Sequence, residues 1–146
     1  MATYSSLVSP FLSQTAWLQL NSDVESPSGI TSISAGDSIR VTVAVLSTTS
    51  ANVTIENLTN NETAKKTLTS GTLPLCRQYG AWLVYDTAGR LFDFGTLTYT
   101  NALVSSNGTY HAPYGGNVYL VDMVENGQTV ATTSISSENI TIKYNS

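Results

Sequence analysis

Histidine and cysteine, the residues that most often supply a catalytic imidazole, a thiolate nucleophile or a transition-metal ligand, are scarce in this chain of 146 residues. His111 is the only histidine and Cys76 the only cysteine, so the sequence offers no internal disulfide and no imidazole- or thiolate-rich metal site. The neighbours Pro113 and Gly115 predict that His111 is a loop residue rather than a catalyst. No Gly-Xaa-Ser-Xaa-Gly elbow accompanies this single imidazole. We therefore expect no metal, no cofactor and no serine hydrolase.

Carboxylates are the remaining candidates, because two of them in different environments can act as acid and base. Those on or beside expected strands are Glu56, Asp86, Asp93, Asp122 and Glu125. Carboxylates at strand ends mostly face solvent or cap turns, and the spacing singles out no pair. The types and spacing of these carboxylates therefore do not identify a catalytic group.

Charge and composition exclude several classes of partner. The chain has 6 basic and 10 acidic residues and a net charge of −4. The basic residues are scattered: Arg40, Lys65, Lys66, Arg77, Arg90 and Lys143. Nucleic-acid binding needs clustered basic groups, so we expect no nucleic-acid partner. No apolar run reaches the ~18 residues of a membrane span. Hydrophobic residues make up 41% of the chain, which is enough for one folded domain.

Alternating apolar residues predict β-structure throughout the chain. The period of two runs through residues 39–45, 52–56, 96–100 and 140–144. No window of 12 residues has the helical period with helix-forming neighbours, and short strands at regular spacing in one domain are typical of a sandwich or barrel. We predict an all-β, antiparallel β-sandwich with essentially no helix.

Two segments and one turn refine this prediction. Residues 81–85 and, apart from Asp122, residues 118–124 are apolar or aromatic, which predicts strands buried on both faces. The Asn126-Gly127 pair predicts a type I′ turn that joins residues 119–124 to residues 129–134 as a hairpin.

The first 15 residues differ from residues 16–146, which we interpret as a single β-sandwich domain. This N-terminal arm contains Leu7, Val8, Phe11 and Leu12. Because that much apolar surface is rarely left in water, we expect the arm to dock on its own chain or on a neighbour.

Five Asn-Xaa-Ser/Thr sequons occur, at Asn52, Asn57, Asn61, Asn107 and Asn139. They are open to two interpretations. Sequons arise by chance in a chain this rich in Asn, Ser and Thr, or they mark N-linked glycans on an extracellular or cell-surface protein.

Longer motifs point to a known family. Five segments carry the likeness: residues 28–39 (Ser-Gly-Ile-Thr-Ser-Ile-Ser-Ala-Gly-Asp-Ser-Ile), 53–59 (Val-Thr-Ile-Glu-Asn-Leu-Thr), 75–77 (Leu-Cys-Arg), 92–102 (Phe-Asp-Phe-Gly-Thr-Leu-Thr-Tyr-Thr-Asn-Ala) and the closing hairpin 126–144. In this order they resemble the fungal glutamic peptidases, the eqolisins or peptidase family G1, over about residues 16–146. The resemblance implies a concanavalin-like jelly-roll sandwich of two curved sheets. It also implies a relation to secreted acid endopeptidases in which a Glu acts as general base on water and a Gln binds the oxyanion.

The same resemblance places the family's catalytic residues on positions that do not retain them. The catalytic Glu falls on Tyr85 and an earlier Glu on Ala81. A phenol with a pKa near 10 is no base at acidic pH, and on a strand the adjacent Asp86 projects to the opposite face. The family's Gln belongs to an N-terminal segment that has no counterpart here, and neither Gln14 nor Gln19 lies in a matching motif. We therefore expect a fold reused without its chemistry, a pseudoenzyme.

Three functions stay open. The first is a structural or self-assembling subunit, an oligomer or filament in which the N-terminal arm adds a strand to a neighbour. The second is a glycan- or peptide-binding module on the concave sheet. Its ligand face would include Trp17, Gln19, Tyr79 and Tyr85, with Tyr110 and Tyr114 as further exposed aromatics. The third is a residual acid endopeptidase that needs a partner chain or uses a site rebuilt around Asp86, Asp93 or Glu56.

Overall fold

The computed structural model describes residues 33–69, 80–84, 93–114 and 118–145 in full, and residues 2–8, 18–20 and 23–25 by their backbone. Within these ranges every regular element is a strand and every strand pairing is antiparallel, which confirms the all-β prediction. The described residues include no helix long and apolar enough to cross a membrane.

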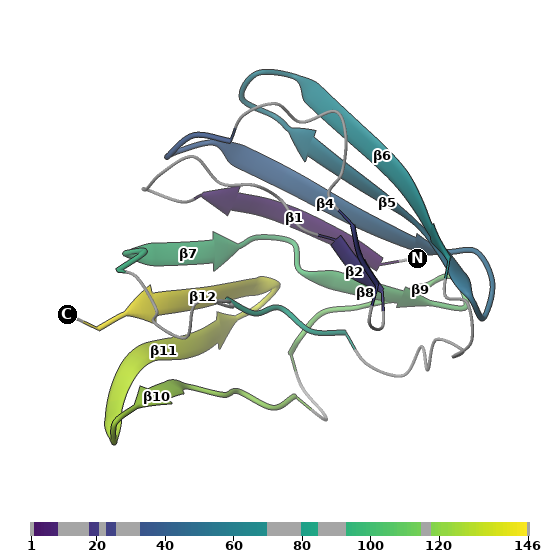
Figure 1. Cartoon of the computed structure of the whole chain (residues 1–146). Coiled ribbons are helices and arrows are strands. Elements are labelled where there is room, and N and C mark those ends of the chain that lie inside the picture. The colour runs from purple at the N-terminus through teal and green to yellow at the C-terminus, as the bar shows by residue number, and fades with distance from the viewer. Residues whose placement is uncertain are drawn as a thin grey trace.

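The strands form three sheets (Figure 1). The six-stranded sheet has the order β6 (Glu62–Thr69), β5 (Ser50–Asn57), β4 (Ser38–Val45), β1 (Ala2–Val8), β8 (Leu103–Ser106) and β9 (Thr109–His111). The four-stranded sheet has the order β10 (Met123–Glu125), β11 (Gln128–Ser136), β12 (Asn139–Tyr144) and β7 (Thr96–Tyr99). The two-stranded sheet pairs β2 (Leu18–Leu20) with β3 (Asp23–Glu25).

The alternation through residues 39–45 and 52–56 falls on β4 and β5 as predicted, and β6, for which no alternation was noted, completes the meander. Ile39, Val53 and Ile55 are buried and form a cluster with Ile33 and Leu68. Branched side chains suit this pleated, half-buried surface, and burying each of these contributes about 1.5–3 kcal/mol. The opposite face carries polar pairs such as Arg40 and Glu56, and burial alternates along β5 and β6.

A second cluster lies on the four-stranded sheet. It consists of buried Leu97, Ala102, Ala131, Ile140 and Ile142. The turn that joins β10 to β11 is the predicted one: Asn126 has φ 50° and Gly127 has φ 78°, and Glu125 pairs with Gln128. Two consecutive positive φ angles are those of a type I′ turn, so the hairpin prediction is confirmed, although β10 is shorter than expected.

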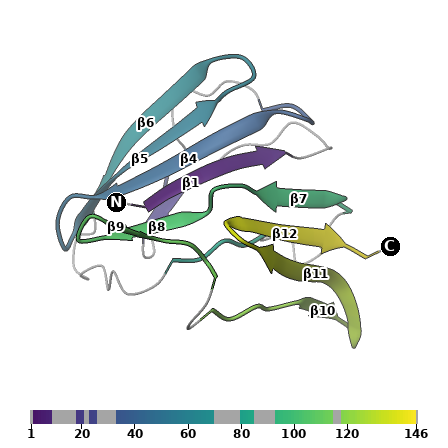
Figure 2. The ribbon, with the colours of Figure 1, turned by 180° about the vertical axis from the view of Figure 1, so that it is seen from behind.

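One stretch of chain connects the two large sheets. After β7 the chain turns at Asn101, which has φ 50°, and continues as β8 in the other sheet. Ala102 between them is fully buried, and its N–H donates to the Glu138 carbonyl oxygen at 2.8 Å. β1 and β7 lie side by side in both views, so the two sheets meet there (Figure 1 and Figure 2).

The start of the N-terminal arm lies inside the large sheet. The backbone of β1 pairs with β4 on one side, as in Thr3 opposite Thr42, and with β8 on the other, as in Thr3 opposite Leu103. Both neighbours belong to the same chain. The side chains of Leu7 and Val8, and Phe11 and Leu12 altogether, lie outside the described residues, so assembly through the arm stays a prediction.

The prediction of two strands buried on both faces is wrong for the described parts of both segments. Ala81 and Leu83 are exposed, and Leu83 retains 60% of its accessible surface. Tyr119 and Val121 are 87% and 76% exposed. A strand is buried on both faces only where a layer covers each face, and a run of apolar residues does not reveal whether that layer exists.

The second of these segments lies at the edge of the four-stranded sheet. There the Thr133 N–H donates to Asp122 Oδ1 at 2.8 Å, and the pairing of β10 with β11 is irregular between Met123 and Val124. A side chain thus takes the place of a backbone partner at Asp122, and backbone pairing begins at Met123 and becomes regular only after the register shift that follows it.

Candidate functional site

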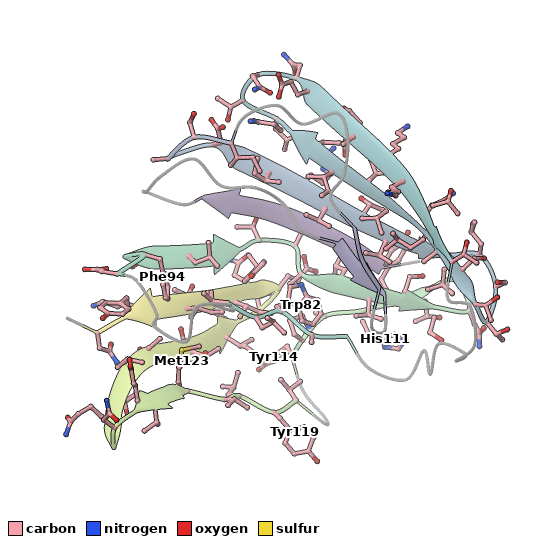
Figure 3. The ribbon with its side chains drawn as sticks, in the orientation of Figure 1. Trp82, Phe94, His111, Tyr114, Tyr119 and Met123 are labelled. Carbon is pink, nitrogen blue, oxygen red and sulfur yellow. The ribbon has the colours of Figure 1, made fainter. Side chains whose placement is uncertain are left out.

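Residues 80–84 lead into the position that the resemblance gives to the catalytic Glu. Trp82 and Val84 are half-buried and pack against the cluster of the four-stranded sheet, where Figure 3 shows the Trp82 side chain. Ala81 and Leu83 are on the open side of the segment. The resemblance places the earlier Glu on this open face. Its described side chains are the methyl group of Ala81 and the isobutyl group of Leu83, and neither exchanges protons.

Tyr99 of β7 holds this segment. Its Oη donates to the Leu83 carbonyl oxygen at 2.9 Å. Burial raises the pKa of Tyr99 to about 12, because the phenolate would have to form away from water. The neutral phenol therefore serves as a hydrogen-bond donor to the segment of residues 80–84.

Gly80 allows the segment to run close to β8. A Cβ at this position would lie 2.8 Å from Cγ2 of Val104. Carbon atoms that are not bonded to each other rarely approach within 3.4 Å, so only glycine leaves room for this side chain. Gly80 and Tyr99 together position the segment that precedes residue 85, where the resemblance places the catalytic Glu.

Three of the five carboxylates singled out in the sequence have a contact of their own with another part of the chain. Glu56 forms an ion pair with Arg40 at 3.6 Å across β4 and β5. Asp93 accepts the Gly95 N–H at 2.8 Å in a turn, and Asp122 accepts the Thr133 N–H. These contacts are structural, and the described part of the chain brings together no group of three His, Cys, Asp or Glu residues that would suit a metal ion. Glu125 lies exposed in β10, and Asp86 lies outside the described residues.

His111 differs slightly from its prediction. It is the last residue of β9 rather than a loop residue, and it is exposed.

One carboxylate was missed by the sequence reasoning. Asp37 Oδ2 accepts the Ser34 N–H and the Asn57 Nδ2–H, both at 2.8 Å. These two hydrogen bonds, that from Ser34 first, lower the pKa of Asp37 from its ordinary value of 3.8. The signal was the turn sequence Ala-Gly-Asp, in which Gly36 has φ 88°, and such a turn favours a local Asp contact.

The predicted ligand face is described only in part. Trp17, Tyr79 and Tyr85 lie outside the described residues, and Gln19 is described by its backbone in β2. Tyr110 and Tyr114 are exposed, as predicted for aromatics at a binding surface. A further exposed group, residues 118–121, is named the apolar strip below. Its members are Val118, Tyr119, Leu120 and Val121.

Comparison with known proteins gives consistent results. Residues 9–144 match the model of the Peptidase A4 family. Aspergillopepsin-2 of Aspergillus niger is 33% identical over an alignment of 136 residues, which covers 88% of this chain and 47% of the relative. The chain thus spans about half the length of this curated relative.

The solved structures agree with this match. Aspergilloglutamic peptidase from Aspergillus niger superposes with a TM-score of 0.78 at 27% identity, over 97% of this chain and 98% of that one. Scytalido-glutamic peptidase, crystallised with a transition state analog inhibitor, superposes with a TM-score of 0.69 at 23% identity, over 98% and 84% of the two chains. The second likeness bears on the fold alone. The predicted eqolisin-type β-sandwich is confirmed.

Proposed function

The chain belongs to the Peptidase A4 family, the glutamic peptidases or eqolisins, and on this premise we propose that it is a non-catalytic member that serves as an extracellular or cell-surface structural subunit and associates with copies of itself. One observation carries the first half of the proposal. The motif resemblance places Tyr85 at the position of the family's general base and Ala81 at the position of the earlier Glu.

The difference between a carboxylate and a phenol decides the chemistry. At pH 4, a phenol with a pKa near 10 is ionised in about one molecule in a million, whereas an ordinary Glu is ionised in roughly a third of the molecules. The described neighbours Ala81 and Leu83 supply no substitute base. The water molecule that attacks a peptide bond would therefore have no acceptor for its proton at this position.

Self-association is supported by the surface of the four-stranded sheet. The apolar strip runs into the edge strand β10 and leaves Tyr119 and Val121 in solvent. Edge strands with exposed apolar side chains pair readily with a second chain. The N-terminal arm offers another route, because β1 fills its own sheet and exchange of this strand between copies would keep the same pairing.

The test has two separate readouts. Purified full chain is incubated with a carboxymethylated, unfolded protein between pH 2 and pH 6, and we expect no new fragments above the buffer control. Cleavage that is lost in a Tyr85→Phe variant would overturn the non-catalytic assignment. Light scattering over a range of concentrations reports self-association, and a monomer at every concentration would refute that half while leaving the other intact.

A binding module is the second candidate, because the exposed Tyr110, Tyr114 and Tyr119 are of the type that contacts glycans and peptides. A glycan array and a peptide pull-down without hits would set it aside. The third candidate, an acid endopeptidase that depends on a partner chain, predicts cleavage only after that partner is added to the incubation.

A further inference from the structure

The five sequons lie in different environments. Asn57 is fully buried, whereas the other four asparagines are exposed. An N-linked glycan is bulky and hydrophilic, so the folded chain can carry it only where the asparagine reaches solvent. The structure therefore separates sequons that share one sequence motif.

Asn57 is part of the polar contact between the ends of β4 and β5. Its Nδ2 donates to Asp37 Oδ2 at 2.8 Å, and its Oδ1 accepts the Thr59 N–H at 3.0 Å. Thr59, the third residue of the sequon, also accepts the Ser38 N–H on its Oγ1 at 3.0 Å. A sugar on Nδ2 would have to displace this network, because no part of the Asn57 surface reaches water.

Three sequons begin at hairpin turns. Asn61 precedes β6 with φ 63°, and Asn107 lies between β8 and β9 with φ 51°. Asn139 starts β12 directly after the turn that contains Ser137 at φ 55°. The side-chain amides of these three asparagines form no hydrogen bond within the described part of the chain, so Nδ2 is free to react.

Asn52 is exposed but lies within a strand. It is paired on both sides in β5, opposite Ala44 and Thr67, and its Oδ1 accepts the Thr67 hydroxyl at 2.7 Å. A glycan there would lie across the neighbouring strands, so we leave this position out of the assignment.

We propose that Asn61, Asn107 and Asn139 are N-glycosylation sites and that the Asn57 sequon is a structural motif that stays unmodified. The inference depends on the extracellular placement in the proposed function. The co-reactant is an oligosaccharide linked to a lipid pyrophosphate. Asparagine Nδ2 forms a bond to the anomeric carbon, the bond from that carbon to the pyrophosphate oxygen breaks, the lipid pyrophosphate leaves with the electron pair, and Nδ2 loses one proton.

Asn107 is the sharpest case, because all three residues of its sequon are exposed. Replacing Asn107 itself would confuse the result, since its positive φ is tolerated by asparagine better than by most residues. Thr109→Ala removes the sequon and keeps the turn residue. Thr109→Ser keeps the sequon and serves as the matched control. Thr63→Ala and Thr63→Ser do the same for Asn61.

The experiment uses the full chain with a secretion leader in an N-glycosylating yeast. The secreted, folded protein is treated with a peptide N-glycosidase in heavy-oxygen water, which marks each formerly glycosylated asparagine, and the peptides are analysed by mass spectrometry. We expect the label on Asn61, Asn107 and Asn139 and none on Asn57. After correction for the substitution itself, the intact mass should show one glycan fewer in Thr109→Ala and the same number of glycans in Thr109→Ser.

A glycan on Asn57 in the secreted, folded protein would overturn the structural assignment of that sequon. A bare asparagine at a hairpin sequon would overturn the assignment at that position. Neither outcome bears on peptide cleavage, so failure here is distinguishable from failure of the non-catalytic proposal.

Discussion

Gly80→Ala should destabilise the fold through one identifiable contact. The new Cβ would lie 2.8 Å from Val104 Cγ2, about 0.6 Å or more inside an ordinary carbon–carbon contact. The Val104 side chain is half-buried and branched at Cβ, so it cannot swing aside as the end of a long side chain would. Overpacking of this kind costs about 1–3 kcal/mol.

Equilibrium unfolding in urea measures the effect. For a slope of about 2 kcal/mol per molar urea, the midpoint should fall by about 0.5–1.5 M with an unchanged slope. Val104→Ala supplies the decisive comparison, because it removes the methyl group that the new Cβ would meet. The double variant should recover most of the loss caused by Gly80→Ala, with a coupling of about 1–2 kcal/mol.

Gly36→Ala is the matched control. Space around Gly36 is open, but its φ of 88° is strained for alanine, so its loss should be independent of Val104. The reasoning is refuted if Gly80→Ala is neutral or stabilising, as expected where alanine only restricts the unfolded chain. It is also refuted if the effects of Gly80→Ala and Val104→Ala are simply additive.

Three further predictions follow from the contacts described. Tyr99→Phe should cost about 0.5–1.5 kcal/mol in urea unfolding and speed amide hydrogen exchange in residues 80–84, while Tyr110→Phe, on an exposed ring, should change neither. The lowered pKa of Asp37 implies a contribution to stability that is present above pH 3.8 and is lost as the pH falls through the pKa of the folded state. The melting temperature of Asp37→Asn should therefore depend less on acid pH than that of the unchanged protein, and equal dependence in both would contradict this. Val121→Lys should shift the molar mass measured by light scattering toward that of the monomer, whereas Thr67→Lys, on a different sheet, should not. Equal association of both variants would exclude the apolar strip as the surface through which copies associate.

The alternation of apolar and polar residues predicted the strands well where one face of the strand is buried and the other faces solvent. The periods through Ile39 and Ile140 fall on β4 and β12 because burial on one face imposes a period of two. The Asn126-Gly127 turn was predictable for a local reason, since its φ angles suit these two residue types. Such features depend on short stretches of chain.

Features that depend on distant neighbours were not predictable. Tyr119 and Val121 belong to an apolar run, and only the arrangement of strands shows that no described layer covers them. The Asn57 sequon resembles the other four, and its burial arises from contacts with the turn at Asp37, 20 residues away. The position of Tyr85 in the site came from the resemblance, because no spacing rule singles out one tyrosine among eight.

The passage of the chain from β7 into β8 has a consequence for how the molecule unfolds. Residues 96–106 contribute a strand to each large sheet, with Ala102 buried at the junction and bonded to the β11–β12 turn. Opening either sheet would therefore pull on a strand of the other. We expect the two sheets to melt as a single cooperative unit, with one calorimetric transition, despite their separate apolar clusters.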